Sequence, residues 1–456
     1  MASSVKTVFD KAFFCGLAAQ NRARFLQCIG LKSGIVYLAG GESSVRYDTD
    51  VDIDFRQESN FYYLSCVTDP DCALAIDLSS SKVTLFAPKL PDAHALWLGA
   101  IKPLDQIREE NSVDEVKYAS EAADHLKAFQ QVYALPKQTV PGVEEAQVDR
   151  SVLRSALIEA RMIKSADELA LMRHAAQISS RGHELLMRAV LRDDVTAENH
   201  LHSEFLYHCY KNNCRFQAYT AIVAAGRGGA VLHYMDNNAP IKGSDMMLVD
   251  AGAEFGCYAA DITRCFPANG EWTDAHKEIY NIVLHCQKEV IAKLKPGVSY
   301  LELHELALRL IGEGLVKYGF LKGSVDELME HDIPAVFCPH GLGHLIGLDV
   351  HDVGGYPDGV ERSTRPSFRY LRMNRVLKEN MVITIEPGCY FVSSALEPAL
   401  ADPAQSKYFV LEKIAQFRDF GGVRIEDDIV ITKDGSESLS DAVKEIADIQ
   451  AIQKKQ

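Results

Sequence analysis

The sequence lacks the segments that mark membrane, secreted and nucleic-acid-binding proteins. Its longest apolar runs fall far short of the roughly 20 residues that a membrane span needs. The eleven cysteines are odd in number and form no C-x-x-C pair, which favours a reduced cytosolic set over disulfides or a zinc knuckle. No Lys/Arg cluster offsets a formal charge of -15, so phosphate backbones are repelled. We therefore expect a cytoplasmic protein that binds neither membrane nor nucleic acid.

Internal repeats and low-complexity tracts are absent as well. A chain of 456 residues exceeds the usual size of one hydrophobic core, so we expect two domains, at residues 1–160 and 161–456. The apolar run at 12–19 follows the charged Lys11 and precedes Arg22. This pattern predicts a short buried helix rather than a signal peptide.

The first 150 residues alternate between strand-like and helical patterns. Short β-branched runs bounded by turn residues predict strands at 34–39, 72–77 and 82–88. Residues 112–129 are more typical of a helix. This half contains no phosphate-binding loop and no metal-ligand cluster, and we interpret it as a small α/β domain.

The second half begins after a proline-containing loop at 135–143. A helix over 152–161 is predicted as the connector. Ser165 and Glu168 have the spacing of a capping box, and apolar residues then recur at the spacing of a helix with one buried face.

The stretch 246–267 (MMLVDAGAEFGCYAADITRCFP) predicts two strands joined by a tight turn. A two-residue turn at 255–256 would place Asp250 directly opposite Asp261, with Cβ atoms about 5 Å apart. Aspartate is disfavoured inside strands, and two such close carboxylates repel each other unless a cation lies between them. In the alternative, one aspartate caps a turn and the other pairs with Arg264.

The stretch 338–356 (CPHGLGHLIGLDVHDVGGY) carries His340, His344 and His351. Glycines between the first two histidines argue against a helical H-E-x-x-H arrangement and favour a loop or strand. The glycine spacing does not fit a dinucleotide fingerprint, because the interval is wrong and no strand-to-helix unit surrounds it. Three histidines so close together favour a binding site over three unrelated core residues.

Two strand-like runs then supply glutamates. Residues 381–387 (MVITIEP) end on Glu386, and residues 422–432 (GVRIEDDIVIT) enclose Glu426. Charges within an apolar strand are costly unless they form ion pairs or bind metal, and an ion-pair network is the alternative. Four carboxylates and one imidazole suit manganese, cobalt or zinc. They exceed what one catalytic zinc usually takes, whereas two metals about 3.5–4 Å apart would use them all.

The ordered motifs D-A-G, A-D-I-T, P-H-G-L-G-H, V-H-D, I-E-P-G and R-I-E-D-D resemble those of the pita-bread metallopeptidases, which include methionine aminopeptidase, aminopeptidase P and prolidase. Further likeness lies at 40–47, 55–59, 350–357 and 420–426, and it is greatest to prolidase, the Xaa-Pro dipeptidase. The resemblance implies an α+β fold: a small N-terminal α/β domain, then a catalytic domain with a curved antiparallel sheet flanked by helices.

The resemblance also implies a set of metal ligands. Asp250, Asp261, His344, Glu386 and Glu426 would hold two divalent ions, with manganese expected and cobalt or zinc as alternatives. Asp261 and Glu426 would bridge the ions, which share a hydroxide that attacks the scissile carbonyl. Glu386 would pass a proton to the leaving nitrogen.

Other residues match the family's substrate contacts. His233 and His351 would donate hydrogen bonds to the substrate and to the developing oxyanion. His340 would line the proline pocket, and Arg424 would buffer the ligating carboxylates.

Dipeptide specificity requires a cation for the free carboxylate, and Arg372 stands where the resemblance expects it. Arg369 and Arg375 are the alternatives, and all three could instead form a solvated basic face. The segment 235–244 is shorter than expected for animal prolidases, which would alter one wall of the substrate pocket.

Hydrolysis of Xaa-Pro dipeptides is thus the expected activity. The nearest alternative is aminopeptidase P activity, which removes the N-terminal residue from longer peptides. A non-catalytic binding protein and metal-free creatinase-like chemistry are disfavoured, because all five ligands are present. The resemblance further implies a homodimer in which the first domain helps to form the interface and shields the opposite active site.

Overall fold

The computed structural model describes residues 8–454. The chain divides into two compact units, Met1–Ala170 and Leu171–Gln456. The sequence-based boundary after residue 160 lies just before helix α7 (Ala166–Ala189), which runs through the division.

The first unit contains six helices and six strands among its described residues. They are α1 (Lys11–Ile29), β1 (Ile35–Ala39), α2 (Ser59–Ser65), β2 (Ala73–Asp77), β3 (Val83–Ala87), α3 (His94–Leu98), α4 (Leu104–Glu110), β4 (Glu115–Tyr118), α5 (Ala122–Leu126), β5 (Val132–Tyr133), β6 (Val148–Asp149) and α6 (Val152–Met162).

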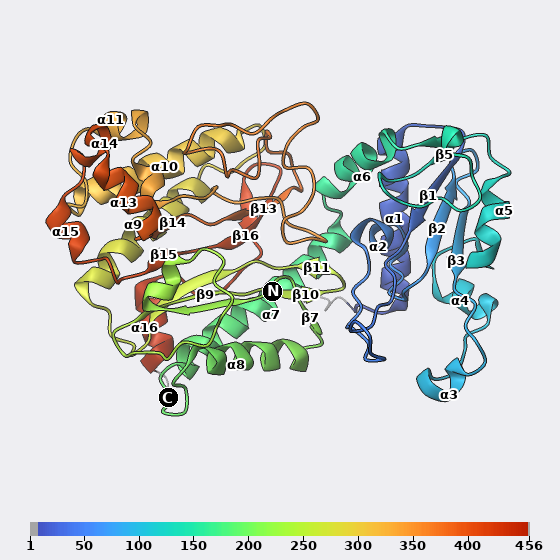
Figure 1. Cartoon of the computed structure of the whole chain (residues 1–456), viewed down its shortest axis with the longest axis horizontal. Coiled ribbons are helices and arrows are strands. Elements are labelled where there is room, and N and C mark those ends of the chain that lie inside the picture. The colour runs from blue at the N-terminus through green and yellow to red at the C-terminus, as the bar shows by residue number, and fades with distance from the viewer. Residues whose placement is uncertain (1–7, 455–456) are drawn as a thin grey trace. The chain divides into compact units, whose positions relative to one another are not determined.

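The strands of this unit form one mixed sheet in the order β4-β3-β2-β1-β5-β6 (Figure 1). The three strands predicted from β-branched runs are β1, β2 and β3, which pair antiparallel, while β4, β5 and β6 are joined in parallel. The helix predicted at 12–19 is part of α1, which packs on α2 and α6. The prediction of a short buried helix was wrong in length and burial, because α1 extends to Ile29 and only Leu17 and Ala18 of 12–19 are buried.

The helical prediction for residues 112–129 was wrong in its first half. Glu115–Tyr118 forms strand β4, and α5 follows it only at Ala122. The parallel register with β3, which begins at Thr84 opposite Glu115, supplies a partner that no local pattern reveals. Long-range pairing therefore decides the conformation of this charged edge strand.

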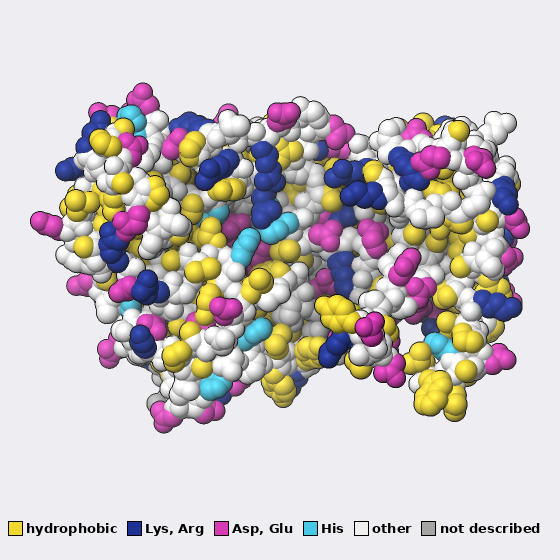
Figure 2. Space-filling model, in the orientation of Figure 1, with side chains coloured by type: hydrophobic (Ala, Val, Ile, Leu, Met, Phe, Trp, Pro, Cys, Tyr) yellow, Lys and Arg dark blue, Asp and Glu magenta, His cyan; other side chains and the backbone are white. Residues whose placement is uncertain are grey.

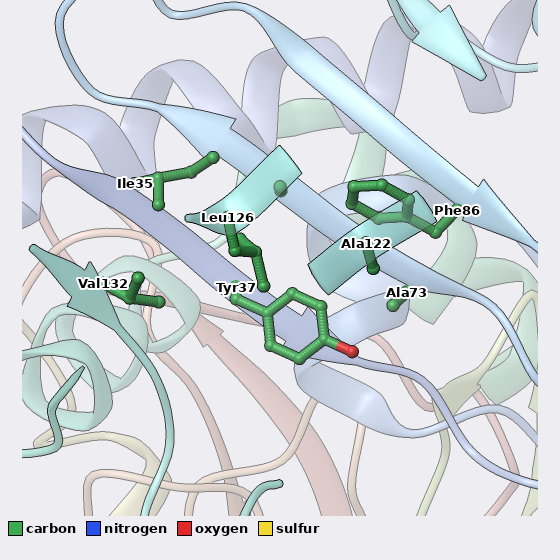
Figure 3. Close-up of a cluster of buried hydrophobic side chains, with 8 residues drawn as sticks. Ile35, Tyr37, Ala73, Phe86, Ala122, Leu126 and Val132 are labelled. Carbon is green, nitrogen blue, oxygen red and sulfur yellow. The ribbon is translucent and has the colours of Figure 1, made fainter. Parts of the chain in front are cut away.

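A buried apolar cluster holds α5 against one face of the sheet, as Figure 3 shows. Leu126 of α5 and Phe86 of β3 are completely buried in it. Its other members are Ile35, Tyr37, Ala73, Ala75, Ala122 and Val132. This unit thus has a core of its own.

The second unit contains most of α7 and the remaining elements. They are α8 (Glu198–Lys211), β7 (Phe216–Gln217), β8 (Ile222–Ala225), β9 (Met246–Asp250), β10 (Ala253–Phe255), β11 (Tyr258–Ala259), β12 (Thr263–Pro267), α9 (Asp274–Ile291), α10 (Tyr300–Lys317), α11 (Val325–Glu330), α12 (Pro334–Phe337), β13 (Val382–Ile385), β14 (Gly388–Tyr390), α13 (Ser393–Ala401), α14 (Pro403–Ser406), α15 (Leu411–Ala415), β15 (Gly422–Arg424), β16 (Asp427–Ile431), β17 (Ser436–Ser438) and α16 (Ile446–Lys454).

Strand pairing in this unit is antiparallel throughout the described residues. The strands form four small sheets. An isolated backbone bridge joins Thr263 of β12 to Glu426, and another joins Leu345 to Ile383 of β13. Helix α8 packs on β8, and α9 packs on β13, β14 and β15 (Figure 1). An antiparallel sheet flanked by helices is the expected architecture.

The predicted capping box at the start of α7 is present. The Glu168 backbone N–H donates to the Ser165 hydroxyl at 3.2 Å, and the Ser165 N–H donates to the Glu168 carboxylate at 2.7 Å. These bonds satisfy two amide groups that the first helical turn leaves without partners.

Candidate metal centre and active site

The hairpin that carries the two aspartates turns one residue later than predicted, at Gly256 and Cys257. Phe255 pairs with Tyr258, and both turn residues have positive φ, 54° and 63°, as a type I′ turn requires. Asp250 consequently faces Thr263 rather than Asp261.

Asp261 lies further along the same hairpin, in the gap between β11 and β12. A Cβ at Gly252 would come within 1.7 Å of the Ala260 carbonyl oxygen, so only glycine permits the close approach of the strands here. The Asp261 N–H donates to the Asp428 carboxylate at 3.1 Å, which fixes the backbone that carries the Asp261 side chain.

His344 lies in a loop, which is one of the two predicted conformations, and this loop bridges to β13 through Leu345 and Ile383. Its backbone N–H donates to the Thr384 hydroxyl at 3.1 Å, and its carbonyl accepts from the Thr384 N–H at 2.8 Å. The Nδ1 atom lies 3.0 Å from the Leu345 carbonyl, which can only accept, so Nδ1 carries the proton. The Nε2 lone pair is therefore free to bind a metal.

Two carboxylates approach this Nε2 atom. Asp261 Oδ2 lies 3.4 Å away and Glu386 Oε1 lies 3.5 Å away. Glu386 follows directly after β13, and its N–H donates to the Leu342 carbonyl at 2.8 Å, which joins the two loops.

Glu426 occupies the break between β15 and β16. It accepts a hydrogen bond from the Thr263 hydroxyl at 2.6 Å. The adjacent Asp427 points elsewhere and pairs with Arg264 at 2.6 Å, so the ion-pair alternative holds for Asp427. The predicted alternative of an ion pair between Arg264 and Asp250 or Asp261 is not found among the described residues.

Three of the predicted ligands converge. Atoms of Asp261, His344 and Glu426 all lie within 4.8 Å of one another, and the three side chains are buried. Figure 2 shows histidine and acidic side chains gathered in a hollow over β9 and β16. Burial and the repulsion of Asp250 raise the pKa of Asp261, and burial and the repulsion of Asp261 raise that of Glu426.

Burial also raises the pKa of Glu386, to about 7, and the repulsion of Asp261 and Asp250 adds to this effect. The cluster therefore has an excess of buried negative charge that a cation would relieve. Oxygen donors with one imidazole fit a divalent metal of the manganese, cobalt or zinc kind.

Asp250 is held beside this cluster by two neighbours. One carboxylate oxygen accepts a hydrogen bond from the Tyr219 hydroxyl, and the other forms an ion pair with Arg424. Arg424 also donates to the Thr263 hydroxyl at 3.1 Å and to the Tyr390 hydroxyl at 2.9 Å.

His340 has both ring nitrogens engaged. Nδ1 lies 2.7 Å from the Gly341 carbonyl, and Nε2 lies 2.9 Å from the Tyr390 hydroxyl. Neither nitrogen is available to a metal, so the geometry agrees with a role for His340 outside the ligand set.

The remaining predicted residues surround the cluster. The His351 ring lies 4.5 Å from that of His344, between centroids. Burial, His344 and Arg372 lower the pKa of His351 to about 3, and His233 also lowers it slightly. Of the three candidate arginines, Arg372 thus exerts its charge on the site, whereas Arg369 is exposed and lies over the Tyr370 ring.

Two protein-family models match the chain, one over each unit. Residues 170–433 match the model of metallopeptidase family M24, and residues 18–134 match that of the aminopeptidase P N-terminal domain. The chain belongs to metallopeptidase family M24.

Relatives extend the M24 assignment over nearly the whole chain. A Xaa-Pro dipeptidase of Rattus norvegicus is 41% identical over 95% of this chain and 93% of its own length. A probable Xaa-Pro aminopeptidase of Podospora anserina is 42% identical over 91% of each chain. The solved aminopeptidase PepP of Pseudomonas aeruginosa has a TM-score of 0.81 and 31% identity, covering 98% of both chains.

This M24 chain is accordingly a metallopeptidase, and its buried carboxylate–histidine cluster fits the divalent metal that such enzymes require. Its catalytic unit has the pita-bread fold of the aminopeptidase P structures. No helix in residues 8–454 combines the length and apolar character needed to cross a membrane.

The sequence analysis missed the residues that hold the site residues in place. These are Tyr219, Thr263, Thr384, Tyr390 and Asp428. Thr263 and Asp428 stand beside recognised motif residues, so their position was a usable signal. Tyr219 and Tyr390 belong to other segments, and only the fold brings them to the site.

Proposed function

We propose that this M24 metallopeptidase hydrolyses Xaa-Pro dipeptides, releasing the first residue and free proline. The observation that carries the proposal is the position of Arg372, whose charge acts on both His344 and His351 beside the carboxylate cluster. A cation that acts on these two histidines suits the free carboxylate of a dipeptide, which a longer peptide would not present there. The rat dipeptidase relative supports the same substrate class.

In this proposal, Asp250, Asp261, His344, Glu386 and Glu426 bind two divalent ions. When bound, such ions lower the pKa of a water molecule and polarise the scissile carbonyl. Glu386 would move the proton to the leaving nitrogen.

The remaining residues would orient the substrate. His233 and His351 would donate hydrogen bonds to it and to the developing oxyanion. His340, fixed by Tyr390, would line the proline pocket, while Arg424 would balance the charge of Asp250 and Glu426.

The first experiment compares release of proline from Gly-Pro with cleavage of Gly-Pro-Pro, using EDTA-stripped enzyme with and without manganese. We expect metal-dependent hydrolysis of the dipeptide. Preferential cleavage of the tripeptide would instead indicate aminopeptidase P activity, which the name of the Podospora relative favours. Absence of cleavage with manganese, cobalt or zinc would indicate a binding protein.

A second experiment assigns the carboxylate-binding arginine. We expect R372M to raise KM for Gly-Pro, since the substrate carboxylate loses its partner, and to affect Gly-Pro-Pro much less. R369M is the matched control, because Arg369 is exposed. An equal rise in KM for R369M would remove the assignment.

Manganese is our proposed native metal, and analysis of the metal content of enzyme purified without added metal would test it. Cobalt or zinc would also suit the donor set. A cytoplasmic location is supported by the eleven cysteines, all within residues 8–454 and all free thiols.

A homodimer is supported by the exposed apolar residues of α3. Leu96, Trp97 and Leu98 are 77%, 79% and 70% exposed, and three adjacent apolar side chains on a surface helix suit a protein interface. We propose that the first unit contributes to the dimer and shields the opposite active site. Light scattering tests this, and a fully active monomer would contradict it.

A further inference from the structure

The segment that carries His233 has no regular hydrogen-bonded structure of its own beyond a short 3-10 turn at Gly226–Ala230. It leaves β8 at Ala225 and returns toward β9 after Ala239. His233 itself is exposed, and it lies close enough to His340 and His351 to lower the pKa of each, though less than burial and other neighbours do. Something outside the segment must therefore fix its path.

One buried carboxylate holds this segment at three points. Glu198 Oε1 accepts from the Ala225 N–H at 2.7 Å, and Oε2 accepts from the Ala239 N–H at 2.8 Å. The same Oε2 accepts from the hydroxyl of Tyr234, the residue that follows His233, at 2.8 Å. Both ends of the segment and its middle are thus attached to a single side chain.

Glu198 is itself rigidly placed. It is completely buried as the first residue of α8, and its N–H donates to the Ala239 carbonyl at 3.0 Å. Among the described residues, no Lys or Arg side chain pairs with it. The N-terminal end of the α8 dipole and three donors stabilise its charge instead.

Asn237 attaches the segment to the sheet. Its side-chain oxygen accepts from the Val223 N–H at 2.7 Å, and its side-chain nitrogen donates to the Ala221 carbonyl at 2.8 Å. The amide thus takes the place of a neighbouring strand at β8.

We propose that Glu198 is a positioning residue that acts through His233. Three donors converge on a group that can only accept, and no other residue type of this size accepts from all three. This inference rests on the proposed function, in which His233 contacts the substrate. Glu198 sets the position of that contact without touching the substrate.

A double-mutant cycle with E198Q and H233A tests this inference. Glutamine keeps the shape but places an NH₂ group against at least one N–H or O–H donor, so the segment must shift. We expect E198Q to lower kcat for Gly-Pro about tenfold with little change in KM, since small displacements of catalytic groups reduce kcat strongly. In the H233A background, E198Q should lower kcat no further.

An equal factor in both backgrounds would overturn the inference, because Glu198 would then act independently of His233. A wild-type kcat in H233A would overturn the proposed role of His233 and the inference with it, while leaving the dipeptidase activity itself unaffected.

Two further variants keep the test sound if E198Q folds poorly. Y234F removes one of the three donors and should lower kcat by less than E198Q, again only when His233 is present. E204Q is the matched control on the same helix, because Glu204 bonds to Arg192 and not to this segment. Manganese content and thermal unfolding should match the wild type in Y234F and E204Q, and a loss of metal in Y234F would contradict a role confined to His233.

Discussion

Glu426 and Asp427 are adjacent in the sequence, yet the regions around them shift the pKa of a buried carboxylate in opposite directions. On the Glu426 side, the nearest cation is Arg424 at 3.9 Å, and the pKa of Glu426 is raised by burial and by Asp261. On the Asp427 side, Arg264 and Lys444 each lie 2.6 Å away. These cations outweigh burial and lower the pKa of Asp427 to about 2.

The contrast separates a structural carboxylate, Asp427, from a proposed metal ligand, Glu426. The protein supplies its own cations to Asp427, which also accepts a hydrogen bond from the Gln287 side chain at 3.0 Å. Arg264 is held in turn by hydrogen bonds that it donates to the Glu426 and Ala442 carbonyls. It leaves the Glu426 side short of positive charge, as a site for cations from solution requires. The interruption between β15 and β16 thus places one carboxylate in an ion pair and the next one beside the proposed metal site.

The largest effect should come from the structural side. D427N leaves the fully buried Arg264 without its anionic partner, so we expect a loss of about 3–5 kcal/mol in the free energy of unfolding. Denaturant titration measures this loss. The kcat of the folded fraction should stay within a few-fold of wild type. D434N, at an exposed position near β16, is the control and should leave stability unchanged.

E426Q should show the reverse pattern. Removing a proposed ligand should lower kcat by on the order of 100-fold or more, since even partners of metal ligands contribute 10–100-fold. The metal-free protein should become more stable, because one of several repelling carboxylates is gone. A destabilised E426Q with normal kcat would mean that the two sides have been assigned the wrong way round.

A smaller effect is expected at the carboxylate-binding arginine. A Cβ at Gly355 would lie 2.0 Å from the Arg372 carbonyl oxygen, so G355A must displace Arg372. We expect KM for Gly-Pro to rise about tenfold, as a loss of ~1.4 kcal/mol in binding would give. G243A, whose nearest neighbour would lie at 3.7 Å, should leave KM unchanged.

The smallest effect should be the pH dependence of the metal-free protein. Asp427, with its lowered pKa, contributes stability above pH 4 that is lost as the pH falls toward 2. Glu386, with a pKa of about 7, contributes stability below pH 4.5 that is lost as the pH rises through 7. The unfolding temperature of EDTA-treated protein should fall both toward pH 2 and toward neutral pH, and manganese should remove the fall near neutrality. A single acid limb without metal would contradict this account of Glu386.

Sequence patterns predicted the parts of the molecule whose cause is local. The β-branched runs located β1, β2 and β3, and the Ser165–Glu168 spacing located the start of α7. Carboxylates inside strand-like runs and a cluster of three histidines also pointed to Asp261, Glu426 and His344, which the fold brings together.

The features that the sequence did not predict depend on distant partners. Strand β4 forms because β3 provides a parallel partner for its backbone hydrogen bonds. The register of the 246–267 hairpin follows from the positive φ of Cys257, a residue type that gives no turn signal in the sequence. Tyr219, Tyr390 and Glu198 act across many residues of intervening chain, so no spacing rule could associate them with the site.

The position of Glu426, between β15 and β16, has a consequence for the order in which the enzyme is synthesised, folds and binds metal. The proposed ligands extend from Asp250, on β9, to Glu426, which reaches Thr263 through a single backbone bridge. The chain must therefore be translated beyond Glu426 before all five proposed ligands can meet. Any metal held by the full set of proposed ligands would therefore be taken up only after the segment that carries Glu426 has reached Thr263.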